Sequence, residues 1–151
     1  GKIVFTGIPN FAPEILRRVH LNDPMKQKHL ARALTSLAEE GVTQVFKPEI
    51  GSQWIVGVVG ALQLDVLKSR LVAEYGLDVG LEPSPYDCAR WISGTKADLE
   101  DFAARNRGGM AADRDGAPVF LAKSAWEVGY VVEKFPKIAF AKTRERSDVK
   151  V

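Results

Sequence analysis

The chain has 151 residues, of which 46% are hydrophobic and 26% are charged, and its formal net charge is +2. This length and composition suffice for one ordinary domain or two small ones without disulfide or metal staples. The single cysteine, Cys88, excludes an internal disulfide, and nothing in the sequence resembles a signal peptide or a transmembrane span, so the cytosol is the expected compartment.

The N-terminal stretch, residues 1–13, begins with a strand-like Ile3–Phe5 and continues with Gly-Ile-Pro-Asn and Ala-Pro steps. Such steps favour turns and extended backbone and are typical of a linker between domains. We therefore expect the chain to be a piece of a longer protein.

Residues 14–83 predict the order strand, helix, strand, strand, helix, strand. The alternating pattern of residues 14–21 indicates the first strand. Asp23 followed by Pro24 predicts a helix start, because the aspartate caps free backbone N–H groups and proline needs none at the first helical position. This helix is expected to extend to about Glu40.

A hairpin and a second helix complete this half. Two β-branched and aromatic runs, 42–47 and 54–59, are separated by a turn, which favours antiparallel pairing. From Ala61 the apolar spacing changes to three and four residues, which predicts an amphipathic helix to about Tyr75. Residues 77–81 predict a short final strand.

The same order of elements is predicted again for residues 84–146. Two helices each begin with a capping box, Thr95-Lys-Ala-Asp98 and Ser124-Ala-Trp-Glu127. Strand-like runs lie before the first helix (86–93), between the two helices (110–113 and 119–122) and after the second helix (137–142). The sequence therefore predicts an α+β fold of two ferredoxin-like (split β-α-β) subdomains in tandem. Polar residues from Thr143 onward, including the tail 147–151, are expected to fray.

Groups suited to catalysis or metal binding are sparse. His20 and His29 have no acidic residue or cysteine at a metal-ligand spacing, and Cys88 has no identifiable base beside it. The step between Gly57 and Gly60 lacks the lysine of a phosphate loop. The sequence predicts no catalytic, cofactor-binding or metal-binding residue, and no enzyme activity for this chain by itself.

RNA contact is better supported, through basic side chains more than through aromatic ones. Four aromatic residues, Phe46, Trp54, Trp91 and Phe120, lie in predicted strands, where packing beneath helices is favoured over base stacking, and the RNP1 signature is absent. Clusters of basic side chains offer contacts to phosphates. The candidates are Arg17, Arg18, Lys26, Lys28, Arg105, Arg107, Lys137, Lys142, Arg144 and Arg146.

Several stretches resemble translational GTPases. Residues 60–65, Gly-Ala-Leu-Gln-Leu-Asp, resemble a helix start in the third domain of elongation factor G. Residues 5–14, Phe-Thr-Gly-Ile-Pro-Asn-Phe-Ala-Pro-Glu, the triplet 89–91, Ala-Arg-Trp, and the ending from Phe135 to Glu145 resemble the peptide chain release factor 3 branch. Elongation factor G has Glu-Leu-His where this chain has Ala-Leu-Gln, which favours the release-factor branch.

The resemblance implies the C-terminal domain of a bacterial release-factor GTPase. Residues 1–13 would be the remnant of a preceding β-barrel domain and its linker, and residues 14–83 would correspond to the third domain of elongation factor G. The resemblance further implies contact with ribosomal RNA and protein, GTP and Mg²⁺ in another domain of the parent protein, and GTP-dependent departure of class I release factors. A monomer without membrane contact is expected, and a dimer would be suspected as a truncation artefact.

The alternative, from a different class, is a small-molecule-binding regulatory module, because tandem ferredoxin-like units often bind ligands at sheet edges. Salt-sensitive ribosome binding without GTP hydrolysis distinguishes the first hypothesis. A tight metabolite ligand distinguishes the second.

Overall fold

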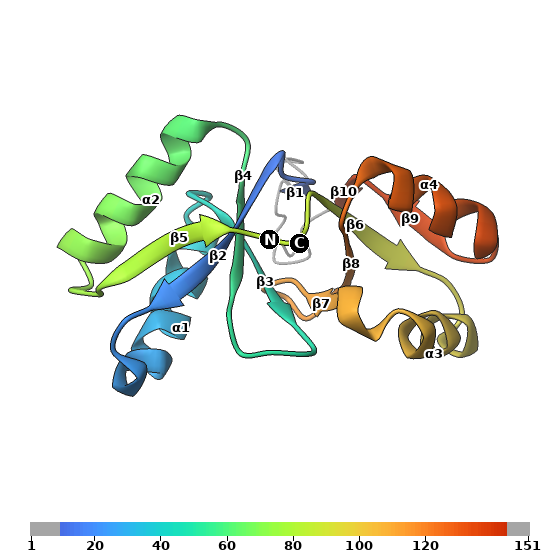
Figure 1. Ribbon diagram of the computed structural model, residues 1–151, viewed down its shortest axis with the longest axis horizontal. Coiled ribbons are helices and arrows are strands. Elements are labelled where there is room, and N and C mark those ends of the chain that lie inside the picture. Colours follow the sequence, from blue (N-terminus) through green and yellow to red (C-terminus); the bar gives the residue numbers. More distant parts are fainter. Residues whose placement is uncertain (1–9, 145–151) are drawn as a thin grey trace, which may run out of the picture.

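The computed structural model describes residues 10–144 and shows an α+β fold in which four helices cover antiparallel strands (Figure 1). The α+β prediction is confirmed at this level. The predicted strand at Ile3–Phe5, the candidate Arg146 and the tail 147–151 lie outside the described residues.

The two halves contain the same order of elements. The first half comprises β2 (Ile15–Leu21), the 3-10 turn η1 (Pro24–Lys26), α1 (Gln27–Glu39), β3 (Gln44–Pro48), β4 (Ile55–Val58), α2 (Ala61–Ala73) and β5 (Val79–Pro83). The second half comprises β6 (Cys88–Ser93), α3 (Lys96–Arg105), the turn η2 (Arg107–Gly109), β7 (Met110–Ala112), β8 (Pro118–Ala122), α4 (Ala125–Lys134) and β9 (Ala139–Ala141). Two short strands, β1 (Asn10–Phe11) and β10 (Thr143–Arg144), pair with each other.

The eight longer strands form one sheet in the order β5-β2-β4-β3-β7-β8-β6-β9. When the strands of each half are numbered in chain order, both halves have the spatial order 4-1-3-2. The halves meet where β3 pairs with β7, through the residue pairs Lys47↔Ala112 and Pro48↔Ala111. This junction is thin, because it has few residue pairs and proline has no N–H to donate.

Three predictions are wrong in detail. The strand predicted at 77–81 begins two residues later, because Gly76 (φ +64°) ends α2 and Leu77 N–H donates to the carbonyl of Leu71, which closes the helix end. Thr143, expected to fray, lies in a strand because β1 supplies a partner. The apolar spacing of Val128, Val131, Val132 and Phe135 predicts one buried helical face, and Val131 is buried as this spacing predicts, whereas Val132 is exposed.

Three apolar clusters form the core. The first lies between α1, α2 and the sheet of the first half, and it is aliphatic, with Leu34 and Leu67 fully buried. The second lies beneath α3 and α4 and is centred on Phe102, whose ring makes edge-to-face contacts with Phe120, Phe135 and Phe140. The third belongs to both halves.

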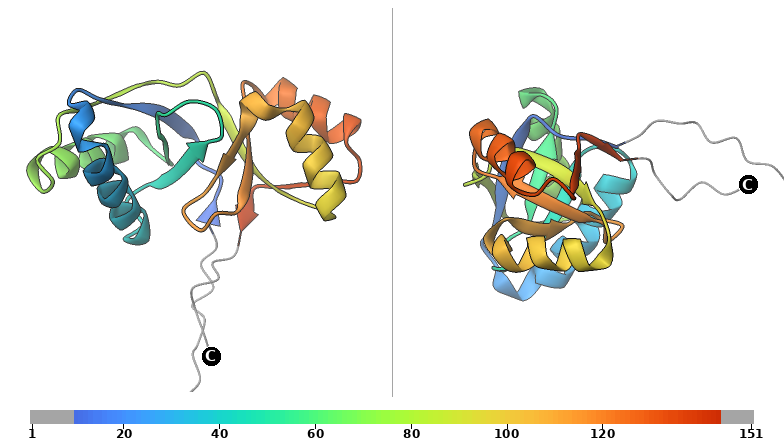
Figure 2. Two further views of the ribbon diagram at one scale, coloured as in Figure 1. Left: turned by 90° about the horizontal axis from the view of Figure 1, so that it is seen from below. Right: turned by 90° about the vertical axis from the view of Figure 1, so that its right-hand side faces the viewer.

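The third cluster joins the helix-free faces of the two halves. Leu16, Phe46 and Ile55 come from the first half, and Trp91 and Leu121 come from the second. The helix pairs accordingly lie at opposite ends of the molecule, with the strands of both halves between them (Figure 1, Figure 2). The sheet therefore folds back on itself, and both of its faces are buried near the centre of the molecule.

Candidate nucleic-acid interface

The helix-free sheet faces are closed to RNA bases by the third cluster. Phe46 is fully buried and its ring centroid lies 6.5 Å from that of Trp91, while Phe120 packs against Phe102 beneath α3. Trp54 is half-buried against the first cluster, with the ammonium of Lys47 5.2 Å from its ring centroid. Packing beneath helices, expected for all four strand aromatics, therefore describes Phe120 and, at the edge of the first cluster, Trp54, whereas Phe46 and Trp91 pack between the halves.

The candidates on β2 are engaged within the sheet. Arg17 is half-buried, and its guanidinium donates to the carbonyl of Leu16 at 3.0 Å. Arg18 forms an ion pair with Glu82 of the neighbouring strand β5 at 3.3 Å. The two guanidinium groups start from opposite faces of the strand, as expected, and the structure does not bring them together with the other candidates.

Four lysine candidates are exposed but separated. Lys26 and Lys28 lie at the start of α1, at the end of the molecule formed by the first half. Lys137 lines a groove of about 240 Å³ that also contains Asp98 and Asp101, so its charge faces carboxylates. Lys142 lies between β9 and β10, where its backbone carbonyl accepts a hydrogen bond from the N–H of Ala12 at 2.6 Å.

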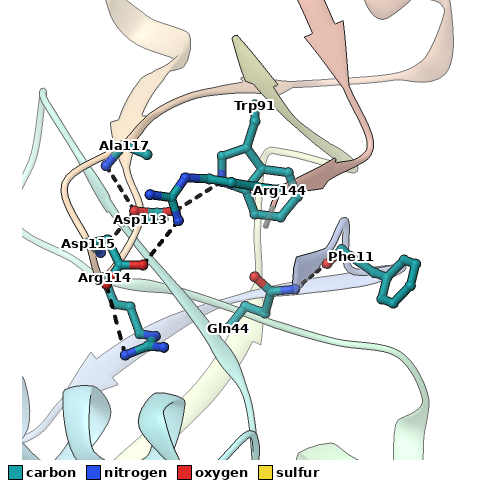
Figure 3. Close-up of polar contacts among 8 residues, drawn as sticks. All are labelled: Phe11, Gln44, Trp91, Asp113, Arg114, Asp115, Ala117 and Arg144. Carbon is teal, nitrogen blue, oxygen red and sulfur yellow. Dashed lines mark hydrogen bonds and ion pairs between the residues drawn. The ribbon is translucent and has the colours of Figure 1, made fainter. Parts of the chain in front are cut away.

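Arg144 belongs to a half-buried polar cluster at the β7–β8 turn (Figure 3). Its guanidinium lies 3.0 Å from the carboxylate of Asp115 and 3.4 Å from that of Asp113. Asp113 also accepts hydrogen bonds from the indole of Trp91 and from the backbone N–H groups of Asp115 and Ala117. The Arg144 charge is thus compensated within the protein. Its role in the fold is to fasten β10 to this turn.

Arg105 and Arg107 are brought together in a groove of about 420 Å³ between the C-terminal end of α3 and the N-terminal end of α4. Lys123 adds a third basic side chain, and Tyr86 contributes an aromatic one whose hydroxyl donates to the carbonyl of Gly108 at 2.7 Å. Glu127 is the acidic side chain among the lining residues.

Local packing fixes the shape of this groove. Asn106 ends α3, and its side-chain amide donates to the carbonyl of Phe102 at 2.9 Å. At Gly109 a β-carbon would lie 2.6 Å from the ring of Phe120 and 2.9 Å from the carbonyl oxygen of Leu121, so the turn can approach β8 only with glycine at this position.

The charge of the groove is only partly compensated. Arg105 pairs with Asp101 at 3.2 Å, a solvent-exposed contact that holds the guanidinium weakly. Among the described residues, Arg107 and Lys123 have no acidic partner. One carboxylate oxygen of Glu127 accepts the backbone N–H of Lys123 at 2.7 Å. The groove therefore presents cations to solvent, as a phosphate-binding surface requires.

Sequence reasoning identified Arg105 and Arg107 but missed Lys123 and Tyr86. The signal for Lys123 is its place directly before the capping box of α4, since a residue there lies at the mouth of a helix start. Tyr86 follows the Pro83-Ser84-Pro85 turn, and its approach to Gly108 joins residues far apart in sequence.

The part of the chain that the structure describes also contains histidine, cysteine and acidic side chains outside the groove. There, no group of three His, Cys, Asp or Glu side chains could hold a metal ion, and no helix is long and apolar enough to cross a membrane. Hydrogen bonds from Arg70 to Glu74 and to Glu40 raise the pKa of Arg70 above its ordinary value, so this side chain joins α2 to the end of α1 as a permanent cation.

The chain matches a known family over most of its length. A family model described as the class II release factor RF3, C-terminal domain, matches residues 5–132. The matched segment covers most of the chain and includes the groove with Arg105, Arg107 and Lys123.

Proposed function

The chain belongs to the family of the class II release factor RF3 C-terminal domain, and from this premise we propose that it is the ribosome-contacting C-terminal domain of a release-factor GTPase. The parent protein carries GTP and Mg²⁺ in another domain and acts in the cytoplasm. It promotes the GTP-dependent departure of class I release factors during translation termination. The chain itself supplies a rigid contact surface and no catalytic group.

The proposal extends to the fold. The 4-1-3-2 strand order of both halves supports two ferredoxin-like subdomains, 14–83 and 84–146. The shared sheet and the third cluster couple the two subdomains into one stiff body, which suits a domain that transmits movement between a GTPase and the ribosome.

The groove between α3 and α4 is the observation that carries the ribosome contact. It brings Arg105, Arg107 and Lys123 together, and the acidic side chain beside them already accepts a backbone hydrogen bond. Phosphates of ribosomal RNA are the partners that such cations bind, with release of counterions that makes the affinity salt-dependent. The other candidate clusters are engaged within the fold, face carboxylates or stand alone.

The test is ribosome binding over a series of salt concentrations, with the double variant Arg107→Ala, Lys123→Ala compared with the wild-type chain. The slope of log affinity against log salt concentration should become shallower by roughly 1.5 units, because each phosphate contact contributes about 0.7 to 0.9. The matched control is Lys26→Ala, Lys28→Ala, which removes two exposed lysines from the first half and should leave the slope unchanged.

A changed slope in the lysine control alone would place the RNA contact on α1 and overturn the groove assignment. Salt-independent binding in all variants would contradict a phosphate contact altogether. GTP hydrolysis by the purified chain, or a tight metabolite found by thermal shift, would contradict the proposed function itself.

A further inference from the structure

The outer face of α4 carries a row of two aromatic rings and a cation that the fold does not use. Trp126, Tyr130 and Lys134 follow one another at a spacing of four residues, which places them on one helical face. The indole of Trp126 is 75% exposed, although burial of a ring of this size is worth several kcal/mol on the scale of about 25 cal/mol per Å².

The geometry of this row differs from that of the buried rings. The rings of Trp126 and Tyr130 are stacked, with centroids 5.6 Å apart and an angle of 14° between their planes. The contacts of Phe102 with its neighbours are edge-to-face, with angles between 70° and 83°. Lys134 completes the row, because its ammonium lies 5.4 Å from the centroid of the Tyr130 ring and 3.1 Å from the phenol oxygen.

The row begins beside the basic groove. Lys123, which lines the groove, directly precedes Ser124, the residue that caps α4, and Trp126 and Glu127 follow in the first turn of the helix. Glu127 also lines the groove. The indole of Trp126 therefore projects from the helical turn that forms one wall of the groove.

We propose that the indole of Trp126 is a stacking platform for an unpaired RNA nucleotide whose neighbouring phosphates lie in the groove of Arg105, Arg107 and Lys123. This inference rests on the proposed function and names the part of the RNA that the surface takes. Parallel aromatic rings beside cations are the arrangement with which proteins hold single-stranded nucleic acid, because every base has a face to stack and every linkage has a charge. Lys123 places a cation at the start of the row, which complements RNA better than an apolar protein surface. Lys134, at the other end, also lines the groove that contains Asp98 and Asp101.

The experiment compares two probes, an oligoadenylate of about eight nucleotides, within the site size of single-strand-binding folds, and the same ribose-phosphate chain without bases. Trp126→Ala should weaken oligoadenylate binding about tenfold at every salt concentration, since loss of one stacked base typically has an effect of this size. It should leave the salt slope and the binding of the abasic chain unchanged. Trp126→Phe should recover most of the affinity.

The matched control is Leu62→Ala, which truncates a side chain of equal exposure on α2 in the first half and should change nothing. Arg107→Ala should give the opposite pattern to Trp126→Ala, with a shallower salt slope for both probes. This difference separates the two proposals.

Retained oligoadenylate binding in Trp126→Ala together with loss in Arg107→Ala would overturn the platform and leave the groove standing. Binding of neither probe by the wild-type chain would overturn both. Weakened ribosome binding of Trp126→Ala with unchanged oligoadenylate binding would assign the row to a protein partner instead.

Discussion

The two halves of the molecule have the same strand order but are stabilised by different means. In the first half, α1 and α2 each have 13 residues, and neither N-cap residue, Lys26 or Gly60, makes a side-chain capping hydrogen bond, although Asp23 caps the 3-10 turn before α1. In the second half, α3 and α4 have 10 residues each, and Thr95 and Ser124 cap them by accepting backbone N–H bonds. The core beneath the longer helices is aliphatic, whereas the core beneath the shorter ones is aromatic.

This difference shows that the topology does not depend on one kind of core. A shorter helix has fewer internal hydrogen bonds to offset its costly nucleation, so its ends need side-chain caps. It also presents fewer side chains to the sheet, and a ring buries more area per residue than a leucine does. The second half therefore reaches the same architecture with fewer, larger contacts. Its outer surface is left to carry the basic groove and the row on α4.

The largest expected effect follows from truncating the centre of the aromatic core. Phe102→Ala should lower the free energy of unfolding by about 4 kcal/mol, because a fully buried ring and three edge-to-face contacts are lost. Leu67→Ala, at a fully buried position on the inner face of α2, should lower it by about 3 kcal/mol. Urea unfolding measures both. Since the halves share a sheet and a core cluster, each variant should keep a single transition. Two transitions, only one of them shifted, would show that the halves unfold separately.

A smaller effect is expected at the β7–β8 turn, which lies where the halves meet. Asp113→Ala should lower the free energy of unfolding by about 2 to 3 kcal/mol, because the indole N–H of Trp91 and two backbone N–H groups lose their acceptor. Asp115→Ala is the control, and it should cost less than about 1 kcal/mol, since its contact with Arg144 is more exposed. Equal losses in thermal or urea unfolding would show that the ion pair, and not the hydrogen-bonded turn, fastens this region.

The smallest effect tests the caps themselves. Ser124→Ala removes the acceptor for the backbone N–H of Glu127 and should lower the free energy of unfolding by about 1 kcal/mol. Gly60→Ala, at the N-cap position of α2, removes no side-chain cap, and a β-carbon there meets nothing within 4 Å. It should lower the free energy of unfolding by less than Ser124→Ala does in the same urea experiment, because no side-chain hydrogen bond is lost. A loss at Gly60 as large as that at Ser124 would contradict the idea that the second half depends more on its caps.

Local features of the fold were predictable from sequence because their causes are local. Asp23 accepts the N–H of Met25, and Thr95 and Ser124 cap their helices, as the spacing of these residues indicated. The folding back of the sheet was not predicted, since an edge strand such as β3 offers its backbone groups to any antiparallel partner. The sequence of β4 nevertheless contained a signal that this strand is covered on both faces. Every residue of Ile55–Val58 is buried, and an unbroken apolar run indicates a strand covered on both faces.

The candidate site was predicted only in part for a similar reason. Sequence shows which side chains are basic, but it does not show which of them the fold neutralises. Arg18 and Arg144 meet carboxylates from distant parts of the chain, whereas Arg107 does not, and nothing in their immediate neighbours distinguishes them. Whether a basic side chain forms an ion pair depends on carboxylates that are distant in sequence. The arrangement of the strands determines which of these carboxylates lie within reach.

The short ribbon of β1 and β10 has a mechanical consequence. The pairs Asn10↔Arg144 and Phe11↔Thr143 run antiparallel, so the chain enters and leaves the described body at adjacent points (Figure 2). Tension applied through both ends would separate the two strands one residue pair at a time. In this pulling geometry the hydrogen bonds break singly and resist force least. Tension carried by one end alone would instead pass into the sheet through β2 or β9. The ribbon thus acts as a weak mechanical link in front of a strong body, and it would yield before the sheet is loaded.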